Sequence, residues 1–507
     1  MKCSQTATWL AVAVLLTSPM AWATNGYFAH GYSASQRAMG GAGTALTEDA
    51  LIATINPAGA YWLEERLDVT LSLFSPIRDY QAGPVGAGAD NSILRLEEGG
   101  LRSDNEMYYI PGFAYTRRLD EVSSWGIAVY GNGGLNTEYR GSTTHFGEGF
   151  AVGVAGLDLI SLETRCEGAF GGGVPVAGEG DTGGFCGNDD ANAGVDLIQL
   201  FIVPHYSRRI GERTSIGIAP IFAGQRFRAD GLGAFRQFSN QPDRVSGTGH
   251  DTAYGYGGRV GILTGAIPGF GFGASYQTRI RMTAFDKYAG LFADDGDFDI
   301  PSTWNIGLSA HPSDDLRIAV DFQRINFSEV KAVGNRFDTN DFVNNCARPR
   351  LLAGLGFGGS LDPSPSCLGS ASGPGFGWQD VEVVKLGVQY RVAAFKLRAG
   401  YSKGDQPIPA SELLFNVLAP AVPEEHFTAG LGYQLSRRVG LDFAFMYAKS
   451  LTVFGPNPLS NTDATAVDLV LGAGSNATAF GADANDQTLR LNMRQWEATF
   501  CFSYRFE

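Results

Sequence analysis

Two long segments of this 507-residue chain carry apolar side chains suited to binding an apolar ligand. In the first segment these residues recur at the spacing of one helix face, and in the second they are adjacent. They are Phe146, Phe150, Val154 and Leu157 in the first, and Leu413, Leu414 and Phe415 in the second. Exposing such residues to water is costly unless they face one another, so together they would form an apolar groove. The alternative is that they only form the core of a loop.

The polar residues do not form a pattern typical of catalysis. The six histidines are scattered, and the sequence contains neither a Gly-x-Ser-x-Gly nucleophile elbow nor a P-loop. It has no Cys-x-x-Cys pair for zinc. The net charge of −14, with no basic cluster, argues against nucleic acid as a partner. We therefore expect no enzyme activity, no metal site and no cofactor.

Four cysteines lie in two long polar segments. Cys166 and Cys186 share one segment, and Cys346 and Cys367 share the other. In an oxidising compartment this arrangement predicts one disulfide within each segment, with free thiols as the alternative. Cys501 is left over and is expected to be a small side chain facing the protein interior.

Residues 1–23 have the pattern of a secretory signal peptide. Lys2 supplies the positive end, residues 9–16 the apolar run, and Ala21-Trp22-Ala23 the cleavage site. The apolar run is too short for a membrane-spanning helix, which needs about 20 residues. The alternative is an uncleaved anchor.

The remaining sequence is typical of β-strands and turns. It is rich in glycine and phenylalanine, and only 18% of the chain is charged. In residues 496–506 apolar or aromatic side chains alternate with polar or small ones, and residues 441–448 alternate in the same way. Strands of about ten residues or more are long enough to cross a bilayer when tilted. Their length distinguishes them from the strands of a soluble sandwich.

Fourteen such strands are predicted, joined alternately by tight turns and by long polar segments. They are expected at residues 65–79, 105–118, 124–137, 195–209, 214–228, 250–265, 270–285, 301–311, 316–330, 380–391, 394–404, 425–436, 438–453 and 489–506. Short turns on one side and long loops on the other are typical of bacterial outer-membrane barrels. The predicted fold class is all-β, with residues 63–507 forming a 14-stranded antiparallel transmembrane β-barrel.

Residues 24–62 are predicted to form a plug, or hatch, inside the lumen of this barrel. The segment is rich in glycine and too short to bury a core of its own, so it needs a surrounding structure. Thr47 is expected to cap a short helical piece, which Asn56-Pro57 ends. Ala58 then allows the chain to pass close to a neighbour.

The hatch segment also resembles a known family. The order Gly26-Tyr27-Phe28, then Gly40-Gly41-Ala42-Gly43, then Asn56-Pro57-Ala58 resembles the hatch of the FadL family of outer-membrane transporters. The resemblance continues in residues 301–307 and 426–433. It implies passive uptake of long-chain fatty acids or, in one branch of the family, of aromatic hydrocarbons.

A deeper ligand site is expected between the hatch and the barrel wall. Phe28 and Ile52 are candidates to line it, with packing inside the hatch as the alternative. Arg37 is a candidate partner for a carboxylate, or else a bridge to the wall.

The resemblance also implies an exit through the side of the barrel. In the family the third strand kinks and opens the wall, so that the ligand leaves into the outer membrane. Here the third strand contains Gly131, Gly133 and Gly134, and glycines inside strands mark bulges or bends. The alternative is that these glycines begin a loop.

The resulting hypothesis is a monomeric transporter in the bacterial outer membrane. Its partners would be hydrophobic small molecules and the lipid of that membrane, with long-chain fatty acids as the first choice of cargo. Capture in the outer loops would be followed by hatch rearrangement and lateral exit. The alternatives are an aromatic-hydrocarbon channel of the same family, an adhesin or structural barrel, and an outer-membrane lipase.

Overall fold

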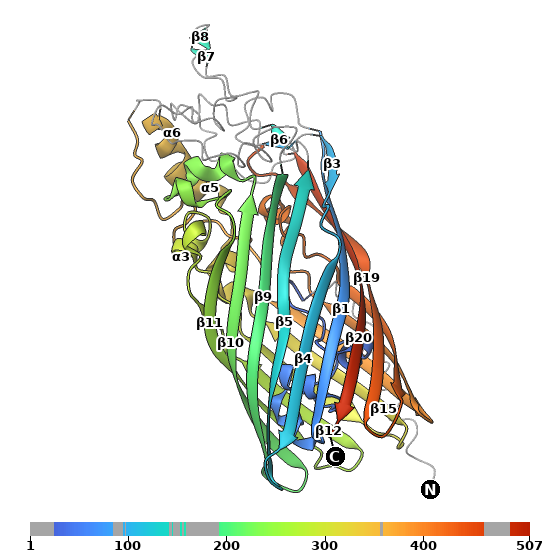
Figure 1. Cartoon of the computed structure of the whole chain (residues 1–507). Helices are drawn as coiled ribbons and strands as arrows, with labels where there is room; N and C mark the ends of the chain where they lie inside the picture. The colour runs from blue at the N-terminus through green and yellow to red at the C-terminus, as the bar shows by residue number, and fades with distance from the viewer. Residues whose placement is uncertain are drawn as a thin grey trace, which may run out of the picture.

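Fourteen antiparallel strands close into a barrel in the computed structural model, which describes residues 25–84, 95–96, 98–140, 144–145, 153–154, 157–158, 192–354, 358–460 and 487–506 (Figure 1). The barrel strands are β1 (Arg66–Ala82), β4 (Tyr108–Arg118), β5 (Ser123–Arg140), β9 (Asn192–Arg209), β10 (Thr214–Asp230), β11 (Asp251–Thr264), β12 (Phe270–Gln277), β14 (Thr303–Ala310), β15 (Leu316–Ile325), β16 (Val381–Val392), β17 (Phe395–Gly404), β18 (Glu425–Gln434), β19 (Val439–Pro456) and β20 (Thr488–Arg505). Each strand pairs with its neighbour, and β1 pairs with β20 to complete the ring. The predicted fold class is confirmed.

Two strands end at least five residues earlier than predicted. The strand expected at 270–285 ends at Gln277, and a separate short strand, β13 (Arg281–Met282), follows it and pairs with β11. The strand expected at 316–330 ends at Ile325, because the next residues form the turn η9 (Phe327–Glu329). A further short strand, β3 (Gly99–Arg102), extends the ladder of β1.

The alternation of side chains along β20 gives the wall an apolar outer face and a largely polar inner face. Phe500 and Phe502 are exposed on the outer face, while Glu497, Thr499 and Cys501 are buried on the inner face. Lipid is a suitable surrounding for the outer face, and the inner face needs polar partners inside the lumen. None of the helices within the described ranges is long and apolar enough to span a bilayer.

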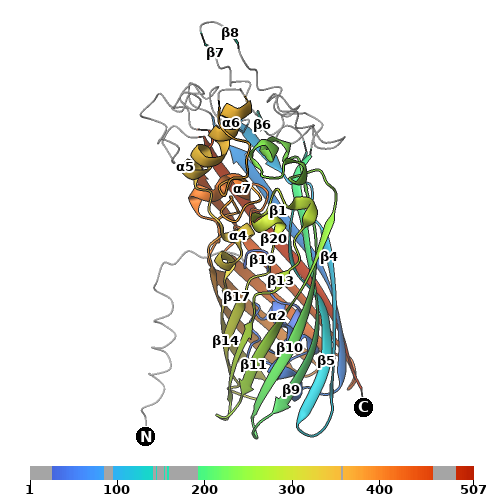
Figure 2. The same cartoon turned by 90° about the vertical axis from the view of Figure 1, so that its left-hand side faces the viewer.

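The hatch lies inside the barrel and supplies many of those partners (Figure 2). Its elements are the helix α2 (Ala34–Ala38) and the 3-10 turns η2 (Ala50–Thr54) and η3 (Pro57–Trp62). Ser33 and Asn56 cap α2 and η3 through their side-chain oxygens. Asp49 caps η2, so the prediction that Thr47 is the cap was wrong by two residues. The shorter, 3-10 piece begins later than expected.

The carboxylate of Asp321 holds the glycine-rich hatch loop to the wall. Asp321 of β15 accepts hydrogen bonds of 2.8 Å from the backbone N–H groups of both Gly43 and Thr44. Wall glycines let the two backbones approach closely. A Cβ atom added to Gly400 would lie 2.1 Å from the Gly40 nitrogen, and one on Gly273 would lie 2.2 Å from the Thr44 carbonyl oxygen. The hatch is therefore fitted to this wall rather than resting loosely in it.

Short helices gather at the end of the barrel away from the C-terminus (Figure 1). They include α3 (Ala293–Gly296), α4 (Lys331–Gly334), α5 (Thr339–Phe342), η10 (Val343–Ala347), α6 (Arg348–Gly354), η11 (Ala410–Glu412) and α7 (Leu413–Asn416). Cys346 and Cys367 form the predicted disulfide within this region. The second predicted pair, Cys166 and Cys186, lies outside the described residues, as does the signal peptide. Cys501 is a free, buried thiol, as expected.

Replacing both Cys346 and Cys367 with serine is expected to loosen the outer segment without unfolding the barrel. The disulfide closes a loop with a sequence separation of 21 residues, and cross-links of this length contribute about 3 kcal/mol. Limited proteolysis of the folded protein should then cut between residues 346 and 367 much faster than in the parent. The Cys501→Ser variant is the control and should be cut at the parental rate. Equal rates in the double variant would contradict the prediction.

Candidate ligand-binding site

The wall has a gap between β4 and β5. Their ladder runs from Arg118 opposite Ser124 only as far as Gly112 opposite Tyr130. Beyond that pair, among the described residues, Tyr108–Pro111 continues to pair with β1 alone, and the rest of β5 pairs with β9. The segment before β4 and the strand β5 meet again where Asp104 N–H donates to the Glu138 carbonyl at 2.8 Å. The gap is therefore bounded at both ends.

A bulge in β5 lies beside this gap. The register with β9 shifts between Gly131 and Gly133, so Asn132 has no ladder partner opposite it in β9. The Asn132 side chain points into the lumen, donates to Gln199 Oε1 at 2.8 Å and accepts from the Tyr32 hydroxyl at 3.0 Å. The glycines of the third strand thus form a bulge within a continuous strand, and not the start of a loop.

The beginning of the hatch bonds to the bulge as a short strand would. Ala29 N–H donates to the Asn132 carbonyl at 3.0 Å, and Gly134 N–H donates to the Tyr27 carbonyl at 3.2 Å. A Cβ atom on Gly133 would lie 1.7 Å from the Tyr27 carbonyl oxygen. Only glycine permits this approach, so Gly133 is required for the hatch to reach the wall.

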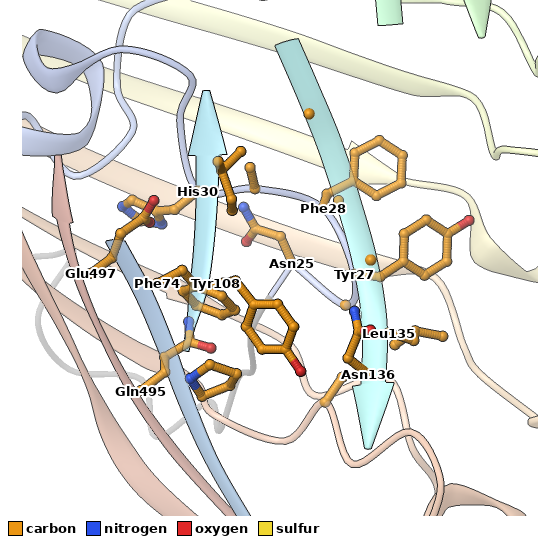
Figure 3. A pocket seen from close by; sticks show the side chains of 18 of the residues that line it. Asn25, Tyr27, Phe28, His30, Phe74, Tyr108, Leu135, Asn136, Gln495 and Glu497 are labelled. Atoms are coloured by element: carbon orange, nitrogen blue, oxygen red, sulfur yellow. The ribbon is translucent and has the colours of Figure 1, made fainter. Parts of the chain in front are cut away.

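A cavity of about 290 Å³ occupies the space between the hatch and the gap (Figure 3). Its walls come from the hatch (Tyr27, Phe28), β1 (Phe74), β4 (Tyr108, Ile110), β5 (Gly131, Gly133, Gly134, Leu135), β9 (Leu197, Ile198) and β20 (Met493). Most of the lining is apolar. Tyr109 and Ile198 also line it, and their side chains are 69% and 43% exposed on the outer face. The cavity therefore touches both the lumen and the outer surface of the wall.

Several polar atoms in and around the cavity have no partner among the described residues. They are the amide atoms of Asn25, the Tyr27 hydroxyl, Gln199 Nε2, His30 Nε2 and Arg78 Nε. Buried polar groups normally find partners. This cluster is therefore suited to a bound molecule with a polar end, in a site that is otherwise apolar.

Arg37 also lines the cavity, but its charge is already paired. Its Nη2 lies 3.0 Å from Glu497 Oε1, and its Nη1 donates to Ser72 and Thr499 of the wall. Of the two roles considered for Arg37, the structure favours the bridge between hatch and wall.

The barrel, its internal hatch and the cavity between them match known proteins. Residues 184–487 match the model of a family described as outer membrane protein transport protein (OMPP1/FadL/TodX). The chain belongs to this family. Membership makes the protein a transporter of hydrophobic compounds in the bacterial outer membrane, and not an enzyme.

Solved structures agree with that assignment at the level of the fold. The chain is similar to a Pseudomonas aeruginosa FadL homologue (TM-score 0.57, 12% identity, 95% of this chain and 100% of that one). It is also similar to the toluene transporters TodX of Pseudomonas putida (0.56, 16%, 94% and 99%) and TbuX of Ralstonia pickettii (0.53, 16%, 94% and 99%). Comparison with curated proteins finds no significant match.

A second, smaller apolar cavity of about 50 Å³ lies among the outer helices of this FadL/TodX-family barrel. Leu414 and Phe415 of α7 line it together with Phe235, Phe292 and Phe376. Leu413 does not line it, because its side chain packs against Gly455 of β19. The second apolar segment of the sequence thus contributes both to a cavity and to the loop core.

The first apolar segment is only partly described. Phe146 and Phe150 lie outside the described residues. The backbones of Val154 and Leu157 pair with each other in β7 (Gly153–Val154) and β8 (Leu157–Asp158), rather than forming a helical turn. The helical spacing in the sequence therefore misidentified the local structure at these two residues.

The two candidate hatch residues have different positions. Phe28 lines the large cavity. Ile52 instead lines a space of about 10 Å³ formed by hatch residues and packs against Gly59, so it belongs to the hatch core.

Sequence reasoning missed Tyr108, Ile198 and Arg78 altogether. Period-two alternation shows which face of a strand these residues occupy. It does not show where the hydrogen-bonded pairing with the next strand stops.

Replacing Asn56 with alanine is expected to destabilise the hatch by about 2–4 kcal/mol, because three hydrogen bonds of this buried side chain are lost. Its Oδ1 accepts from Ala58 N–H at 3.1 Å, while its Nδ2 donates to the carbonyls of Thr44 and Ile262 at 2.9 Å each. Hydrogen exchange of the amides around Pro57 should accelerate, while exchange in β20 should not. Asn344→Ala, at an exposed outer-loop asparagine, is the control and should leave the hatch unchanged.

Proposed function

We propose that the protein takes up long-chain fatty acids by passive diffusion, with lateral exit through the gap between β4 and β5. The observation that carries this proposal is the cavity at the gap, which is lined by hatch residues on one side and by outward-facing wall residues on the other. A molecule leaving through that gap enters lipid directly. It avoids the aqueous periplasm, where exposing an apolar chain to water is unfavourable.

Capture would begin at the outer end of the barrel. Leu414 and Phe415 line the small apolar cavity there, and aromatic rings surround it. A buried methylene contributes roughly 0.8 kcal/mol, so a long acyl chain can be captured without an energy source. The small size of this cavity fits a first, weak landing site better than a final one.

Passage from the outer cavity to the gap would require the start of the hatch to move. Tyr27 and Phe28 stand between the lumen and the bulge, and only a few backbone hydrogen bonds hold them to β5. The rest of the hatch has charged anchors: Arg37 and Glu48 form ion pairs with the wall, and Asp321 of β15 accepts hydrogen bonds from the hatch backbone. Rearrangement confined to the first residues of the hatch is therefore less costly than displacement of the whole plug.

Aromatic hydrocarbons are the second candidate cargo. The solved proteins TodX and TbuX are described as toluene transporters, and the fold is shared with them. Against that alternative, the cavity at the gap contains several polar groups without partners among the described residues, which a neutral hydrocarbon would leave unsatisfied.

Growth of a deletion strain on a single carbon source tests the proposal. Loss of growth on oleate, with growth on an aromatic hydrocarbon and on acetate unchanged, is expected. Loss of growth on the aromatic hydrocarbon alone would replace fatty acids by the second candidate. The strain used carries a single copy of the gene, so unchanged growth on both compounds would overturn the proposal that the protein transports them.

A further inference from the structure

Arg78 is a buried cation at the edge of the cavity, and no salt bridge joins it to a carboxylate in the described part of the chain. It lies in β1, is 5% exposed, and lines the cavity beside Tyr108. Its Nη2 donates to the Asn105 carbonyl at 2.7 Å and to the Tyr108 hydroxyl at 3.4 Å. Its Nε is buried and has no partner among the described residues. Among the described residues, neutral oxygen acceptors therefore satisfy at most two of the five N–H groups of Arg78.

Two other buried arginines that face the lumen are paired with carboxylates. Arg66 pairs with Asp68 at 2.7 Å, and Arg37 pairs with Glu497 at 3.0 Å. Acidic residues of the strands near the gap have cationic partners of their own: Glu138 pairs with Arg140, and Asp196 pairs with Arg226. Arg78 thus differs from the paired arginines in offering its charge to the cavity.

Burying an unpaired charge is costly, and a bound anion removes that cost. The surroundings restrict what kind of anion fits. Phe74, Leu135 and Met493 form apolar walls of the same cavity, while the amide groups of Asn25 and Gln199 offer donors without partners in the described ranges. A molecule with one carboxylate and an apolar tail satisfies both features, because a guanidinium binds a carboxylate through two parallel hydrogen bonds.

We propose that Arg78 binds the carboxylate of an amphiphilic acid, whose apolar tail lies along the cavity towards the gap at Ile198. This inference rests on the proposed transport function and narrows its cargo to ionised acids over neutral hydrocarbons and alcohols. Arg78 thereby gives the site its preference for a carboxylate head group. The apolar walls contact only the tail, so they bind the tail of an acid and the equal tail of an alcohol alike.

Binding of oleate and of oleyl alcohol to the purified protein in detergent separates the head group from the tail. In Arg78→Gln the affinity for oleate should fall by at least about tenfold, since a charge-assisted hydrogen-bond pair is lost. The affinity for oleyl alcohol should stay within about twofold of the parent, because its hydroxyl does not use the charge. Arg78→Lys keeps the charge but not the planar fork, so its affinity for oleate should be intermediate.

Arg259 provides the matched control. It is also buried in the wall without an ion pair to any described residue, but it lies outside the cavity, and Gln277, Tyr130 and Ala53 accept its hydrogen bonds. Arg259→Gln should bind both ligands as the parent does. A selective loss of oleate binding in Arg259→Gln as well would indicate a general effect of lumen charge and would overturn the assignment to Arg78.

Failure of this inference is distinguishable from failure of the proposed function. If Arg78→Gln loses affinity for oleate and oleyl alcohol equally, or for neither, while the parent binds both compounds and takes up oleate, the transport function stands and the role of Arg78 is overturned. If the parent binds neither compound and does not take up oleate, the proposed function fails, and the inference fails with it.

Discussion

Replacing Gly131 with phenylalanine is expected to reduce uptake of the cargo about tenfold to a hundredfold, because added bulk in a packed site costs about 1–3 kcal/mol and here would add to the exit barrier. A Cβ atom at Gly131 would already lie 3.0 Å from the Ile110 side chain across the gap between β4 and β5. The aromatic ring would therefore fill the gap where the ladder of the two strands has ended.

The measurement is uptake of radiolabelled cargo by cells that contain equal amounts of folded barrel. Gly224→Phe in β10 is the matched control, since the nearest atoms to a Cβ there are 3.9 Å away and the strand is paired on both sides. The control should transport at nearly the parental rate. Parental uptake by the Gly131 variant, with the variant folded, would show that the cargo does not leave through this gap.

Replacing Glu48 with leucine is expected to destabilise the hatch by about 3–5 kcal/mol, because a buried ion-pair network loses its central anion. The Glu48 carboxylate contacts Lys396 Nζ at 2.6 Å, Arg398 Nη2 at 3.6 Å, and Arg317 Nη1. Burial by itself would raise the pKa of Glu48. The cations at Lys396, Arg398 and Arg317 outweigh burial and hold the pKa of this carboxyl well below its ordinary value.

A loosened hatch should let small polar solutes through the lumen. Liposomes containing Glu48→Leu should therefore swell faster in sugar solutions than those containing the parent. Asp315→Leu, which removes a half-exposed ion pair with Arg391 in a turn, is the control, and its effect should stay within about 1 kcal/mol. Swelling at the parental rate with unchanged thermal stability would mean that Glu48 does not anchor the hatch.

The pH dependence of this anchor has a definite sign. Because the pKa of Glu48 is lowered in the folded protein, its stabilisation is fully present above the ordinary pKa of a glutamate and is lost as pH falls through the lowered value. The parent should therefore keep its hatch in place from neutral pH down to about pH 5. The Glu48→Leu variant should show no pH dependence from this site.

The two sets of anchors divide the hatch into parts of unequal strength. Arg37, Glu48 and Asp321 fix its middle through charged groups. Residues 27–29 are held to the bulge mainly by backbone hydrogen bonds and by ring contacts such as Tyr27 with Phe327. The part that stands in front of the cavity is thus the part with the fewest charged anchors, which agrees with a local rearrangement during transport.

The sequence alone determined the barrel. Alternation along β20 and β19 requires one apolar and one polar face, and strands this long with short turns between them have few other ways to bury the apolar face. The glycine-rich segment before β1 could not fold by itself, so its place inside the lumen also followed from composition. The Cys346–Cys367 pairing was predictable because both cysteines share one loop.

Only the tertiary structure decided which strands border the gap, and that Arg78 has no ion-pair partner in the described part of the chain. Alternation places Arg78 and Tyr108 on faces of their own strands, but it does not show that the β4–β5 ladder stops at Gly112 and Tyr130. Alternation also does not show which charges pair. Arg37 and Arg78 have the same side chain, but Glu497, more than 400 residues away in the sequence, forms an ion pair with Arg37 only. Register between strands is a long-range property, and local residue patterns do not record it.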